Sequence, residues 1–194
     1  MHHRHLAAPA LTAVVLALSS AQMPLHAQPA ATDSGTTTTT TPRAAAAQGS
    51  KVNRADQRLI RDIAQANMAE VETGKLALEK SQNEQVKTFA QKMIDDHTSA
   101  LNDVQQLAQA KNVDLPDGVD LKHKALATSM RAMSGANFDR DYKKHAGLAD
   151  HRQTHDLLQK TQRNAKDPDL KALAAKMLPV VDGHLKMAEQ MGSR

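Results

Sequence analysis

Four residues have side chains that could bind a metal ion or form buried polar contacts: Glu70, His97, His151 and His184. His97 lies in the middle of an apolar stripe with helical spacing, between Met93 and Leu101. A histidine in such a stripe is predicted to be buried, where a polar group without a partner costs about 1–3 kcal/mol. It therefore needs a hydrogen-bond partner or a metal ion.

The same four residues are predicted to lie at one level of a helical bundle. At a rise of about 1.5 Å per residue, Glu70 lies about 18 Å and His97 about 21 Å from the turn between the first two predicted helices. If the later connection crosses the bundle, His151 lies at about 22 Å and His184 at about 21 Å. One polar side chain from each helix at a common level is how four-helix bundles build metal sites.

Two interpretations of this set remain open. Three neutral imidazoles and a carboxylate suit a transition metal such as zinc, copper or iron, with one coordination position open. Alternatively, the side chains form a hydrogen-bonded polar layer that fixes helix register and holds no metal. Inward histidines without a known ligand motif are more often structural, so the sequence favours the polar layer and keeps the metal site as the alternative.

The elements that would position these residues are all helices. The chain has one Tyr, two Phe, no Trp and no Cys, so it lacks the aromatic residues that favour sheets. Helical periodicity predicts helices over about 54–80, 84–111, 120–133, 136–165 and 168–191. Asn53 is the predicted N-cap of the first helix, and Ser81 with Glu84 forms a predicted capping box before the second.

The connection over residues 112–135 decides the topology. Extended pieces and one short helix can span about 50 Å, which exceeds the length of about 43 Å of the second helix. We therefore predict an all-α, ferritin-like four-helix bundle with a long crossover that carries a short extra helix. The inward face of the 136–165 helix shifts near Gly147, which predicts a one-residue helical bulge.

The N-terminal region predicts export. A basic start, an apolar run from Leu6 to Leu18 and a cleavage site after Ala27 are typical of a signal peptide over residues 1–27. Residues 28–50 are rich in Ala and Thr and are predicted to form a disordered linker before a bundle domain over 52–192. We expect a periplasmic protein, with association with the outer membrane as an option.

Composition also narrows the partners. The formal net charge is +4, yet charges alternate in sign along the helices and aromatic residues for base stacking are scarce. We expect no nucleic-acid binding and no transmembrane anchor after signal cleavage, because the apolar run is shorter than the roughly 20 residues that span a bilayer. The candidate partners are proteins of the cell envelope, and we expect a monomer or a dimer.

Several motifs, taken in chain order, carry a family resemblance: Glu70-Val-Glu-Thr-Gly-Lys-Leu-Ala77, Phe89-Ala-x-x-Met-Ile-x-Asp-His97, Phe138-Asp-x-x-Tyr142, Asp150-His151 and Leu178-Pro-x-x-x-x-His-Leu185. They resemble the exported ferritin-like family called domain of unknown function 4142, whose members are often labelled as outer-membrane proteins. The resemblance covers about Arg54 to Met191 and implies a ferritin-like four-helix bundle. It places the family's inward Glu and His on the four residues named above and implies no activity.

One departure from ferritin-like enzymes bears on function. Their Glu-x-x-His pairs are missing, because Ile94 stands three residues before His97 and Leu148 stands three before His151. A di-iron oxidase is therefore not expected. The leading hypothesis is a non-catalytic periplasmic bundle protein in envelope maintenance or stress, and the alternative is a metal-binding or redox protein. A third, adhesin-like or membrane-associated role rests on the family labels alone.

Overall fold

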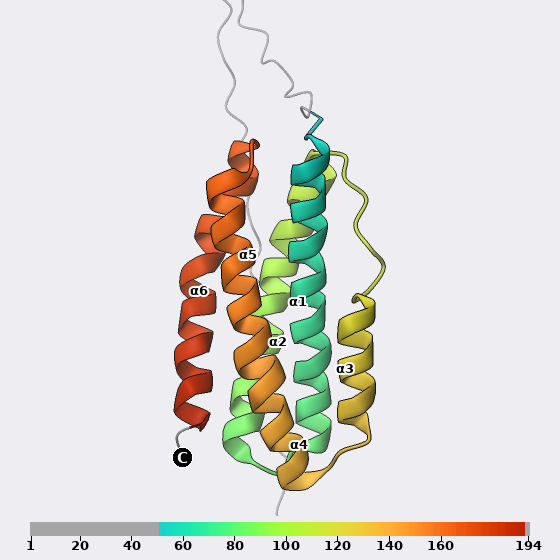
Figure 1. Ribbon diagram of the computed structural model, residues 1–194, viewed down its shortest axis with the longest axis vertical. Helices are drawn as coiled ribbons and strands as arrows, with labels where there is room; N and C mark the ends of the chain where they lie inside the picture. Colours follow the sequence, from blue (N-terminus) through green and yellow to red (C-terminus); the bar gives the residue numbers. More distant parts are fainter. Residues whose placement is uncertain (1–50, 193–194) are drawn as a thin grey trace, which may run out of the picture. The chain divides into compact units, whose positions relative to one another are not determined.

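The computed structural model describes residues 51–192, which fold as an all-α bundle (Figure 1). The predicted signal peptide (1–27) and linker (28–50) lie outside these residues. The bundle has four long helical segments: α1 (Arg54–Lys80), α2 (Glu84–Ala110), a run made of α4 (Gly135–Tyr142), η1 (Lys143–Asp150) and α5 (His151–Asn164), and α6 (Pro168–Gly192). Among residues 51–192, none of the helices combines the length and the apolar composition that a bilayer span requires.

Capping side chains set the helix starts. The Asn53 side-chain oxygen accepts hydrogen bonds from the backbone N–H groups of Ala55 at 2.8 Å and Asp56 at 3.0 Å, which confirms Asn53 as the N-cap of α1. The predicted capping box at Ser81 is wrong. Asn83 caps α2, while the Ser81 hydroxyl donates to Asp139 Oδ1 at 2.6 Å and so ties the turn to α4.

The long connection crosses the bundle as predicted. α1 and α2 are antiparallel, and residues 111–134 then return along the outside of α1 with the short helix α3 (Leu121–Arg131) (Figure 1). The α4–α5 run therefore points in the same direction as α2, and α6 runs antiparallel to it. This topology brings α2, α5 and α6 together at mid-height.

Buried polar residues divide the core into two apolar halves. The half near the start of α1 includes Ile60, Ile63, Val104, Leu158 and Met177. The half near the α1–α2 turn includes Leu76, Phe89, Met93, Phe138 and Tyr142. Between them, at the same level on their helices, lie five buried polar side chains: Asn67, Glu70, His97, His151 and His184.

The predicted bulge near Gly147 is confirmed as the π-helical segment η1. Its wider turns add residues between Tyr142 and His151 without ending the helix. The Tyr142 side chain and the His151 imidazole are consequently both fully buried. The π segment is what turns His151, rather than a neighbour, toward the centre of the bundle.

Gly74 allows α1 and α2 to approach closely. A Cβ atom at this position would lie 2.9 Å from Ile94 Cγ1 and 3.1 Å from the Ala90 carbonyl oxygen. Gly183 in α6 provides the contrast, since a Cβ there would have nothing within 4 Å. The two helical glycines therefore differ in the space around them.

We predict opposite effects for alanine at these glycines. Gly74→Ala forces α1 away from the Ala90 carbonyl and lowers the free energy of unfolding by about 1–3 kcal/mol. Gly183→Ala raises the free energy of unfolding by about 0.5–1 kcal/mol, because an unfolded chain with alanine has less backbone entropy to lose on folding than one with glycine. Denaturant titrations measure both. A stabilising Gly74→Ala would contradict the close approach of the two helices.

Candidate metal centre

Three histidines from three helical segments meet inside the bundle. His97 comes from α2, His151 from the first residue of α5 and His184 from α6, and all three are buried. His151 Nε2 lies 3.4 Å from His97 Nε2 and 3.3 Å from His184 Nδ1. One nitrogen from each of the three rings lies within 4.8 Å of the other two.

The nitrogens that face one another are the inner nitrogens, and the other nitrogen of each ring is its outer nitrogen. Each outer nitrogen lies next to a hydrogen-bond acceptor. His97 Nδ1 lies 2.9 Å from Asn67 Oδ1, and His184 Nε2 lies 2.7 Å from Asp96 Oδ2. His151 Nδ1 lies 2.8 Å from the backbone carbonyl of Ala146 in η1. All three outer nitrogens therefore face oxygen atoms.

The chemistry of those oxygens fixes the position of each ring proton. The Asn67 amide nitrogen donates to the Ile63 carbonyl at 2.7 Å, so its oxygen must be the atom that faces His97. A backbone carbonyl and an ionised carboxylate can accept hydrogen bonds but cannot donate them. Although burial raises it, hydrogen bonds from Lys92 and His184 hold the pKa of Asp96 below its usual value. Each outer nitrogen is thus the donor.

A neutral imidazole has a single N–H group, so the three inner nitrogens carry only lone pairs. Burial lowers the pKa of His151 to about 4. Burial, followed by the neighbouring imidazoles, lowers the pKa of His97 well below its usual value, and burial also lowers that of His184. At neutral pH the rings are therefore neutral, and their lone pairs point at one another with no proton between them.

This arrangement fits a transition-metal ion. Tetrahedral zinc binds histidine nitrogens at about 2.0–2.1 Å, which separates two ligand nitrogens by about 3.3–3.4 Å. The two measured separations at His151 are 3.3 Å and 3.4 Å. Outer hydrogen bonds to a carboxylate, an amide and a carbonyl are also the partners that orient metal-binding histidines. Three nitrogen ligands would leave one coordination position open.

Glu70, the fourth predicted ligand, lies elsewhere. Its Oε1 atom is 3.3 Å from His151 Nδ1, which is the outer nitrogen, so Glu70 stands behind the ring and outside the group of inner nitrogens. Burial, followed by the charge of Asp150, raises the pKa of the Glu70 carboxyl well above its usual range. Neither carboxyl oxygen has a hydrogen-bond partner within the described residues, although His151 lies within ion-pair distance.

Sequence reasoning did not anticipate two of the outer partners. The acceptor for His151 is the backbone oxygen of Ala146, and no side chain marks such a group in a sequence. Asp96 precedes His97 in the sequence, yet it hydrogen-bonds His184 on another helix. Lys92, one turn earlier on α2, also contacts Asp96, with its Nζ atom 2.8 Å from Oδ2.

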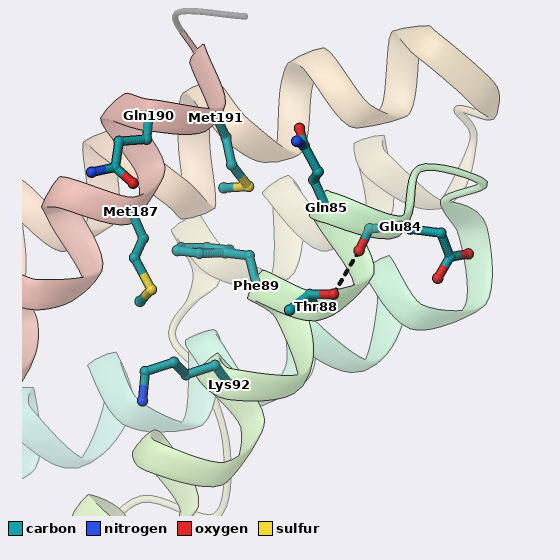
Figure 2. Close-up of a pocket in the computed structure, with 8 residues that line it drawn as sticks. All are labelled: Glu84, Gln85, Thr88, Phe89, Lys92, Met187, Gln190 and Met191. Carbon is teal, nitrogen blue, oxygen red and sulfur yellow. Dashed lines mark hydrogen bonds between the residues drawn. The ribbon is translucent and has the colours of Figure 1, made fainter.

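Cavities flank the histidines on two sides. A recess of about 130 Å³ between α2 and α6 has His97 and His184 in its lining. A polar cleft of about 350 Å³ is lined by Glu70 and by residues of α3 and α5. A third groove, of about 410 Å³, lies between the start of α2 and the end of α6, where Met187 and Met191 extend toward Phe89 (Figure 2). No histidine lines this groove, so it is not part of the candidate centre.

Comparisons with known proteins place this bundle in a family. Residues 40–191 match the family described as domain of unknown function (DUF4142). The chain belongs to this family. The DUF4142 chain also resembles a solved structure, a fragment of DUF305 from Deinococcus radiodurans, with a TM-score of 0.64 and 11% identity over 72% of this chain and 96% of that one. At this identity the likeness shows the fold alone. A comparison with curated proteins gives no match.

The lowered pKa values predict how the metal-free DUF4142 protein responds to acid. Unfolded histidines take up protons near pH 6.5, whereas the folded site resists them until about pH 4 at His151. Because the unfolded state binds more protons in this window, stability falls as pH drops from about 6.5 toward 4. Denaturant unfolding in the presence of EDTA measures this slope. The raised pKa of Glu70 acts in the opposite direction.

The variant His151→Gln isolates the histidine contribution, because the Glu70 carboxyl is present in both proteins. Its stability should fall less steeply over the same window, since one proton-binding group has been removed. An identical slope in both proteins would show that His151 titrates alike in the folded and unfolded states.

Proposed function

We propose that this protein binds one transition-metal ion, such as zinc, copper or iron, through His97, His151 and His184. The convergence of three lone pairs carries the proposal. A polar layer without metal would place a donor against each acceptor, but here every ring proton is used on the outside. The inner nitrogens then repel one another unless a cation lies between them.

The ligand set also narrows the chemistry. Neutral imidazoles suit zinc, copper, iron and nickel and are poor ligands for magnesium or calcium. Glu-x-x-His pairs are absent from the sequence, and Glu70 lies outside the group of ligand atoms. A mononuclear centre is therefore proposed in place of the paired iron site of ferritin-like oxidases.

The N-terminal sequence supports a periplasmic location for this metal-binding protein, in which the domain acts in the maintenance of the envelope or in its response to stress. Residues 1–27 have the pattern of a signal peptide, and no Cys is present that an oxidising compartment would convert to a disulfide. We also propose that the protein contacts other envelope proteins and associates with the outer membrane.

Metal stoichiometry tests the proposed site. The full chain, purified without a His-tag and treated with chelator, should bind one equivalent of Zn²⁺ or Co²⁺ in calorimetry. His97→Ala and His151→Ala should each lose stoichiometric binding. Zinc at one hundred times its dissociation constant should stabilise the wild-type fold by about 2.7 kcal/mol. Thermal melts of the metal-free variants show whether each one is folded.

His155→Ala is the matched control. His155 lies one turn after His151 on α5, is only partly buried, and contacts Asp182 instead of the centre. It should bind metal as the wild type does. If the wild type binds no metal, or if His155→Ala loses metal as completely as His151→Ala, the polar-layer interpretation replaces the proposal.

Export has its own test. Expressed in a bacterial host, the chain should appear in the periplasmic fraction with an N-terminus at Gln28, because cleavage is predicted after Ala27. Mass spectrometry of the purified protein measures the cleavage site. An uncleaved chain in the cytoplasm would contradict the proposed location and would leave the metal site unaffected.

A further inference from the structure

The recess between α2 and α6 gives access to the histidines from one side. Its floor includes His97 and His184, and its walls include the apolar side chains of Ala100, Met177 and Val181. A volume of about 130 Å³ is well below the roughly 300 Å³ at which pockets for drug-sized ligands begin. Only a ligand of a few atoms fits there.

Charge balance indicates what kind of ligand this is. A divalent ion held by three neutral imidazoles carries two positive charges into an apolar interior, which is costly unless they are compensated. Asp96 and Glu70 both lie behind outer ring nitrogens, of His184 and His151 respectively, so neither carboxyl group contacts the ion directly. The group of candidate ligand atoms in residues 51–192 contains histidines alone. A negative charge in direct contact with the ion must therefore come from outside the bundle.

We propose that the metal ion keeps one coordination position open toward this recess, and that a small anion of one to three non-hydrogen atoms binds there. This inference rests on the proposed metal centre and names the ligand class that the centre takes from outside. The ion pair between Lys176 and Asp103, with nitrogen and oxygen 2.7 Å apart, lies in the lining of the recess. Lys176 thus offsets the charge of Asp103, which leaves Asp96, the partner of His184, as the other carboxyl group in the lining.

The cleft on the other side of the centre does not suit this role. Its lining holds Lys160 and five carboxyl groups, against Lys176 and two carboxyl groups in the recess, so it repels an anion more strongly. The five are Asp62, Glu70, Asp120, Asp150 and Asp156. His151 does not line this cleft, and Glu70, which does, lies beside the outer nitrogen of His151. We therefore expect an anion to enter through the recess and not through the acidic cleft.

Two alanines allow these routes to be compared. Ala100 lines the recess and Ala66 lines the acidic cleft, and both side chains are partly buried on long helices. Ala100→Leu would fill much of the recess, and Ala66→Leu makes the same change in the other cavity. Neither alanine contributes a ligand atom to the centre.

The experiment uses the full chain loaded with Co²⁺ and titrated with azide, followed by the visible absorption of the metal. Metal content is measured first for every protein. The wild type should hold one Co²⁺ and show a saturable change in absorption with azide. Ala100→Leu should keep its Co²⁺ and bind azide at least tenfold more weakly, while Ala66→Leu should resemble the wild type.

Each other outcome has a definite meaning. One Co²⁺ without any response to azide would show a closed coordination sphere, which overturns this inference and leaves the metal site standing. Weaker azide binding in Ala66→Leu, with Ala100→Leu unchanged, would assign entry to the acidic cleft and also overturn it. Failure of the wild type to bind Co²⁺ would overturn the proposed function, and this inference with it.

Discussion

Three outward hydrogen bonds at the centre of the bundle determine what this site can do. Asn67, Asp96 and the Ala146 carbonyl each accept a hydrogen bond from the N–H group of one imidazole, and each comes from a different helical segment. Because those protons point outward, three lone pairs remain inside, 3.3 Å and 3.4 Å apart at His151. The same bonds fix the ring orientations before any ion arrives, which is the preorganisation that metal sites require.

The two apolar halves of the core hold this polar layer in place, and the layer leaves some buried polar groups without partners. Two apolar halves of the core enclose the layer from both ends of the bundle, and burial keeps the histidines neutral. Burial also leaves Glu70 and the Tyr142 hydroxyl without hydrogen-bond partners within the described residues. A buried polar group without a partner lowers the free energy of unfolding. Its presence in the core therefore points to a functional role for the polar layer.

Much of the fold could be predicted from the sequence because helices leave local signals. The stripe around His97, the Asn53 cap and the shift of face near Gly147 each depend on residues within a few turns of one another. The crossover followed from the length of a single connection. The predicted capping box at Ser81 was wrong. Asn83, one residue before α2, caps the helix instead, and the Ser81 hydroxyl donates a hydrogen bond to Asp139 in α4.

The candidate site was predictable in part. Helical rise placed three histidines at one level, and they do meet. The same arithmetic placed Glu70 among them, but a level does not say which side of a ring a side chain approaches. The π segment moves His151 so that its outer nitrogen faces Glu70 and the Ala146 carbonyl. Contacts of this kind depend on backbone geometry and on packing between helices, which one sequence does not display.

Long-range proton–nitrogen NMR of the metal-free protein near pH 7 tests the central claim most directly, because it shows which nitrogen of each imidazole carries the proton. The account predicts the proton on Nδ1 of His97 and His151 and on Nε2 of His184, with the other nitrogen of each ring unprotonated. A proton on any of the three inner nitrogens would contradict it, because an inner hydrogen bond would then hold the rings together without a metal ion.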